Sequence, residues 1–178
     1  MLGSFLKRRL NENQIANIFV NGLLDVIDKS FKDVASLINV DPAFELTPGI
    51  DEDDSGEFIM IVFVGNIVHL QSTFETSHYE NIKQLIVKKV APLFGIPESE
   101  FDQLVKEYIS FIARVNKPSK NILYGMSKAL FYKYNLNEFQ TDYYKKIQAP
   151  NPLFLKRMDD IMQNFVWDWT AFFKKYKL

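Results

Sequence analysis

Cysteine is absent from this sequence of 178 residues, and its absence excludes several kinds of chemistry. Without thiols the chain forms neither disulfides nor thiolate metal sites, and it has no cysteine nucleophile. The lack of cysteine is also compatible with a reducing compartment. A very short apolar patch precedes the first charges of the chain, which is the reverse of the order in a signal peptide. We therefore expect a cytoplasmic protein.

The sequence also lacks an excess of charge of either sign. Its 21 Lys and Arg residues nearly balance its 22 Asp and Glu residues, which gives a formal net charge of -1. Because no overall field attracts polyanions, nucleic acid is not an expected partner. No apolar run approaches the about 20 residues that a membrane-spanning helix needs, so we expect no transmembrane segment.

Familiar catalytic motifs are missing as well. The sequence contains no Gly-x-Gly-x-x-Gly, no Walker loop, no Gly-x-Ser-x-Gly and no His-Glu-x-x-His. These motifs mark dinucleotide binding, phosphate binding, serine hydrolysis and zinc proteolysis. The sequence therefore predicts no catalytic residue and no cofactor, and it favours a binding protein over an enzyme.

The longest apolar run, residues 58–70, is the stretch around which we expect the chain to fold. Only Gly65, Asn66 and His69 interrupt it, so other parts of the protein must surround it on every side. Its β-branched residues would also suit a buried strand. However, the run exceeds the usual strand of about 4–8 residues, and no second strand-like run is present to pair with it. We predict a buried central helix over 58–74, with Gly65 allowing close approach of a neighbour.

Amphipathic patterns predict further helices around this centre. Helical spacing of apolar residues, together with capping residues and prolines at the starts, defines them. After a short opening helix over residues 2–10, the main helices span residues 12–38, 76–93, 97–115, 121–134 and 138–147, followed by one continuous final helix from Asn151 through Tyr176. The sequence therefore predicts an all-α fold, with one domain over 1–178 that forms a bundle of about six or seven helices.

One long irregular segment, residues 39–57, is rich in acidic side chains and contains Pro42 and Pro48. Since the part of the chain after Glu57 has more basic than acidic residues, this loop either folds back on that basic part or receives a cationic partner. Its residues 51–56 begin like a calcium-binding EF-hand loop. Val62 then occupies the position of the last, bidentate ligand, so an acidic, solvated loop is the preferred interpretation.

Aromatic residues support our leading functional hypothesis. The chain has 16 Phe and 8 Tyr residues, and this much aromatic surface must be buried internally or against a partner. The end of the predicted final helix is especially rich in them. We predict a non-catalytic module that binds a protein partner or a second copy through Trp167, Trp169, Phe172, Phe173 and Tyr176.

An alternative hypothesis starts from the two polar residues of the central run. Asn66 and His69 would face an internal pocket for an apolar ligand or a metal ion. Glu75 and His78 have the Glu-x-x-His spacing of di-iron bundles, so Glu75, His78 and His69 form a weaker candidate metal site. Such a site needs a second copy of the motif, and His69 and His78 are the only histidines in the chain.

A third pattern is the basic stretch over residues 114–133, which has no acidic residue and contains two tyrosines. Basic groups with interleaved aromatic rings can bind phosphates and stack bases. The overall balance of charge favours a different interpretation. We expect a solvated face that complements the acidic loop.

Overall fold

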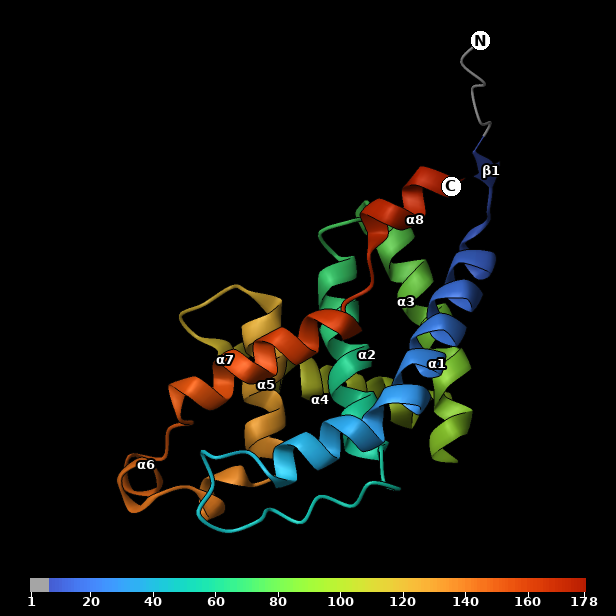
Figure 1. Ribbon diagram of the computed structural model, residues 1–178. Helices are drawn as coiled ribbons and strands as arrows, with labels where there is room; N and C mark the ends of the chain where they lie inside the picture. Colours follow the sequence, from blue (N-terminus) through green and yellow to red (C-terminus); the bar gives the residue numbers. More distant parts are fainter. Residues whose placement is uncertain (1–6) are drawn as a thin grey trace.

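The computed structural model describes residues 7–178, which are largely helical (Figure 1). This confirms the predicted all-α bundle. The elements are β1 (Arg8–Arg9), α1 (Glu12–Asn39), α2 (Gly56–Leu70), α3 (Thr76–Val90), η1 (Ala91–Phe94), α4 (Glu98–Asn116), α5 (Ile122–Lys133), η2 (Leu136–Phe139), α6 (Asp142–Ile147), α7 (Pro152–Met162), η3 (Gln163–Phe165), α8 (Trp169–Lys175) and β2 (Tyr176–Lys177).

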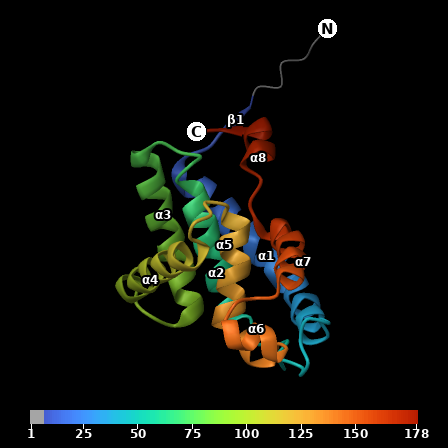
Figure 2. The same ribbon diagram turned by 90° about the vertical axis from the view of Figure 1, so that its left-hand side faces the viewer.

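Helix α2 runs through the middle of the bundle, where α1, α4 and α5 pack against it and α7 packs on α5 (Figures 1 and 2). Ten of its 15 residues are buried, which agrees with a helix that is apolar on every side. The helix ends at Leu70 rather than at residue 74. After it, the amides of Ser72 and Thr73 donate to the carbonyls of His69 and Leu70, which makes a tighter turn than a continued α-helix.

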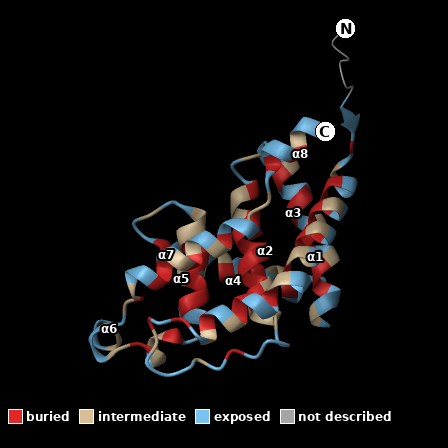
Figure 3. Ribbon diagram, viewed as in Figure 1, coloured by how far each residue is buried: buried red, intermediate tan, exposed pale blue. Residues whose placement is uncertain are grey.

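Gly65 lets α5 approach α2 closely, as the sequence predicted. A Cβ atom at this position would lie 2.6 Å from both Cγ and Sδ of Met126 on α5. Any larger residue would therefore overlap the side chain of Met126. The buried apolar residues of both helices belong to the hydrophobic core, and Figure 3 colours all buried residues red.

The continuous final helix predicted from Asn151 through Tyr176 is wrong. Its apolar stripe is real, but the chain forms α7 and η3, becomes extended at Val166, and resumes as α8. The Asp168 carboxylate caps α8 by accepting the Ala171 amide at 2.8 Å. The predicted helix over 138–147 is likewise divided into η2 and α6, because Gln140 between them has extended backbone.

The opening helix predicted over residues 2–10 is also wrong where the structure describes it. Residues 8–9 form β1, which pairs in parallel with β2, and the Leu10 amide donates to the Lys177 carbonyl at 2.8 Å. Leu2, Phe5 and Leu6 lie outside the described residues. The two ends of the described chain are therefore joined side by side (Figure 1).

The acidic loop over residues 39–57 is held against the bundle at two points. The side-chain amide of Asn39 bonds both the amide and the carbonyl of Ile50, at 2.7 and 2.9 Å. Near the start of the loop, the Asp41 carboxylate accepts two hydrogen bonds from Arg157 on α7, at 2.6 and 2.7 Å. Part of the loop thus folds back on the basic half of the chain.

Candidate functional site

Asn66 connects the central helix to the break between α7 and α8. Its side chain is fully buried, and its Nδ2 donates to the carbonyls of Val62 and Phe165 at 2.8 and 2.7 Å. Its Oδ1 accepts the Trp167 amide at 2.8 Å. Both amide hydrogens therefore go to backbone carbonyls, and the side chain is not among those that line the neighbouring pocket.

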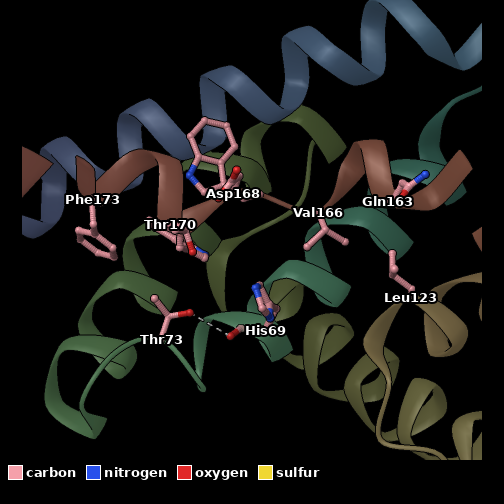
Figure 4. A pocket seen from close by; sticks show the side chains of 10 residues that line it. His69, Thr73, Leu123, Gln163, Val166, Asp168, Thr170 and Phe173 are labelled. Carbon is pink, nitrogen blue, oxygen red and sulfur yellow. Dashed lines mark hydrogen bonds between the residues drawn. The ribbon is translucent and has the colours of Figure 1, made fainter. Parts of the chain in front are cut away.

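His69 does line a pocket, of about 510 Å³, at the C-terminal end of α2. The walls come from the turn after α2, the start of α5 and the segment from η3 to α8. In Figure 4 the imidazole of His69 points from α2 toward the segment that carries Val166 and Asp168. Of the two polar residues predicted to face a pocket, the structure thus places only His69 there.

Three polar side chains around this pocket already have protein partners. The Asp168 carboxylate caps α8, and the Gln163 amide donates to the Asp160 carbonyl at 3.0 Å. The Thr73 hydroxyl is 3.4 Å from the His69 carbonyl. Within residues 7–178, by contrast, neither ring nitrogen of His69 has a hydrogen-bond partner, and the buried Nε1 atoms of Trp167 and Trp169 also have none. The pocket therefore offers one unengaged imidazole beside the aromatic rings of α8.

The aromatic residues predicted as a partner surface pack mainly against their own chain. Trp169 stacks on Phe19 of α1 at 5.7 Å between ring centroids and meets Phe74 edge-on at 5.1 Å. Trp169 and Phe172 are 4% and 6% exposed, whereas Trp167, Phe173 and Tyr176 are half-buried. Much of the aromatic area that suggested a partner is thus buried within the monomer.

The candidate metal ligands are separated. His78 on α3 turns toward α1, where its Nδ1 lies 2.6 Å from Oε1 of Glu12. Glu75 is the residue before α3 and has extended backbone. Over residues 7–178, no group of three His, Asp or Glu side chains is placed to hold a metal ion. The structure therefore does not bring Glu75, His78 and His69 together as a ligand set.

A polar cluster that we did not predict lies at the start of α2. The Tyr108 hydroxyl donates to Oε1 of Glu57 at 2.5 Å, and Nζ of Lys133 is 3.8 Å from the same oxygen. Burial raises the pKa of both Tyr108 and Tyr134, and Glu57 raises it further through its hydrogen bond to Tyr108 and through its charge near Tyr134. These groups come from α2, α4 and α5, so no local sequence pattern could have revealed the cluster. It joins three helices of the bundle.

Exposed apolar side chains gather at the opposite end of the molecule from α8. In the described residues, six of the eight large hydrophobic side chains classed as exposed belong to the end of α1, the following loop, α6 or the start of α7. We call this surface the α6 end, and its members are Leu37, Val40, Leu46, Tyr143, Ile147 and Leu153. Figures 1 and 2 both show these elements at one end of the bundle.

Comparison of the chain with protein-family models, curated proteins and solved structures finds no match. Among the described helices, none is both long enough and apolar enough to cross a membrane.

Proposed function

We propose that this protein is a non-catalytic interaction module that self-associates through the α6 end. The concentration of exposed apolar side chains there carries the proposal, since Val40 is 77% exposed and Leu153 is 64% exposed. Contiguous exposed apolar surface is typical of interaction sites. Burying it against a partner would gain about 25 cal/mol per Å² of apolar area. A cytoplasmic location stays a prediction.

Charge around the α6 end favours a second copy as the partner. Helix α6 carries Lys145 and Lys146 in its last turn, whereas the neighbouring loop carries Glu45, whose amide donates to the Phe139 carbonyl of η2. In a two-fold interface the same surface meets itself in opposite orientation. Such an arrangement can place the lysines of one copy opposite Glu45 of the other, around an apolar centre.

The proposed contact surface differs from the aromatic residues near the end of the chain that first suggested a partner. Trp169 and Phe172 have too little exposed surface to contact a partner unless α8 leaves the bundle. Trp167, Phe173 and Tyr176 retain partial exposure. The α6 end is therefore the better-supported contact surface.

Sedimentation velocity over a range of protein concentrations tests the proposal. We expect the wild type to form a dimer, and Val40→Asp and Ile147→Asp to be monomeric because each places a carboxylate within the apolar contact. Leu93→Asp is the matched control, since Leu93 is 56% exposed but lies on η1, beside α3 and α4. A monomeric wild type, or a dimer that survives both substitutions, would disprove self-association through this end.

A second candidate function is binding of a small organic ligand beside His69, favoured by the unengaged imidazole in the 510 Å³ pocket. Pockets of about 300–1,000 Å³ suit small molecules. Native mass spectrometry of the purified chain separates the two candidates, because it reports subunit number and bound mass together. A monomer with a stoichiometric organic mass that is lost in His69→Leu would support the ligand; a dimer with no added mass supports self-association.

A further inference from the structure

A separate groove of about 400 Å³ lies between α5 and the segment from Pro150 into α7. Tyr124, Lys128 and Tyr132 are four residues apart on α5, so they share one face of the helix and form one wall of the groove. Lys156 and Asp159 belong to the α7 wall. The groove thus gathers part of the basic, tyrosine-containing stretch that the sequence shows over residues 114–133.

The two lysines of the groove are not neutralised by carboxylates. In the part of the chain that the structure describes, no ion pair includes either Lys128 or Lys156. The Lys128 ammonium instead lies 4.5 Å from the centre of the Tyr124 ring. Cations in such a position are attracted to the ring face, and they keep their capacity to donate to an anion.

The one carboxylate of the groove is directed by a different partner. Oδ1 of Asp159 accepts the hydroxyl of Ser127, a fully buried residue of α5, at 2.5 Å. Burial raises the pKa of Asp159, although the Ser127 hydrogen bond acts in the opposite direction. Asp159 is therefore fixed in orientation and remains able to accept a hydrogen bond through its second oxygen.

We propose that this groove binds a small phosphorylated molecule with a flat ring, of the size and chemistry of a mononucleotide. Lys128 and Lys156 would bind the phosphate from the two walls, since ammonium groups form strong charge-assisted hydrogen bonds with phosphate oxygens. The ring of Tyr132, which is 39% exposed, offers a stacking surface. Asp159 would accept a hydrogen bond from an amino group on the ring. This proposal does not rest on self-association through the α6 end, although Ala149 and Pro152 of the groove adjoin Ile147 and Leu153 of that end.

Isothermal titration calorimetry with AMP as the probe tests the proposal, because AMP joins a phosphate to a flat ring that carries an amino group. We expect AMP to bind the wild type, and Lys128→Met and Lys156→Met each to weaken binding roughly tenfold, as loss of one charge-assisted hydrogen bond would. Adenosine and inorganic phosphate alone should each bind more weakly than AMP. Lys120→Met, on an exposed lysine of the same basic stretch outside the groove, should leave AMP binding unchanged.

Three results would overturn the proposal: no binding of AMP to the wild type, equal binding of AMP and adenosine, or equal effects of the groove and control substitutions. A second measurement uses only the wild type and so does not depend on the folding of variants. In an NMR titration with AMP, the shifted amides should lie on α5 and at the start of α7. Shifts confined to the His69 pocket would place the ligand elsewhere and exclude the groove.

Discussion

At the scale of single residues, Asn66 stabilises the point where the last helical stretch is interrupted. Buried polar groups are costly unless they are hydrogen-bonded. The side chain of Asn66 gives one donor to its own helix and uses its remaining groups on Phe165 and Trp167. These two residues flank the point where the backbone becomes extended and cannot satisfy its own polar groups within a helix. One amide thus stabilises both the central helix and the irregular segment against it.

Replacing Asn66 with Leu should destabilise the protein by about 2–4 kcal/mol, because it leaves the Phe165 carbonyl and Trp167 amide without this partner. Urea unfolding followed by tryptophan fluorescence would measure the loss. Asn164→Leu is the matched control: Asn164 is exposed and bonds only carbonyls within its own turn. Its substitution should change stability by under about 0.5 kcal/mol. Equal effects of the two variants would contradict the role assigned to Asn66.

Single-residue expectations from the sequence succeeded where the reason was local. Gly65 was predicted to allow close approach, because a glycine in an otherwise bulky helix has few other uses, and Met126 indeed fills that space. Asn66 and His69 were recognised as exceptions in an apolar run. Their separate environments could not be predicted, since the backbone that Asn66 binds is 99 residues away in sequence at Phe165.

At the scale of elements, apolar periodicity identified the buried faces but not the continuity of the helices. Met162 and Phe165 before the break and Trp169 and Phe172 after it are all buried, so the stripe persists although the helix does not. The opening segment shows the same limitation. Helical spacing of a few apolar residues predicted a helix over 2–10, but Arg8–Arg9 instead pair with Tyr176–Lys177 at the far end of the described chain.

The contact between the acidic loop and α7 gives an element-scale prediction. Asp41 is 8% exposed and is bound by two nitrogens of Arg157. Arg157→Met should lower the free energy of unfolding by about 2 kcal/mol, because it leaves the buried Asp41 carboxylate without its ion-pair partner. The partial exposure of Arg157 limits this loss. Thermal unfolding would measure this loss of stability. Lys156→Met is the control on the preceding residue, and its free energy of unfolding should stay within about 0.5 kcal/mol of wild type. Indistinguishable variants would show that the pair does not anchor the loop.

At the scale of the whole molecule, the division of charge along the sequence is only partly a division in space. Asp41 and Glu57 meet the basic half through Arg157 and Lys133, but Asp53 pairs with Lys32 of α1. The sequence therefore indicated that the acidic loop folds back on the basic half, but it did not identify the residues that pair. The α6 end and the groove between α5 and α7 were not predicted as sites. Both are formed by segments whose proximity depends on the complete fold.

Burial differs so strongly between α2 and α6 that the molecule should open in a definite order. Helix α6 has no buried residue, whereas α2 has contacts on every side. In hydrogen-exchange mass spectrometry we expect α6 amides to exchange first and α2 amides to exchange only on global unfolding. If the α6 end forms the dimer contact, exchange in α6 should slow as wild-type concentration rises, and Ile147→Asp should abolish that dependence. If exchange in α6 does not depend on protein concentration, the proposed dimer contact at the α6 end is contradicted, whereas the helical bundle is not.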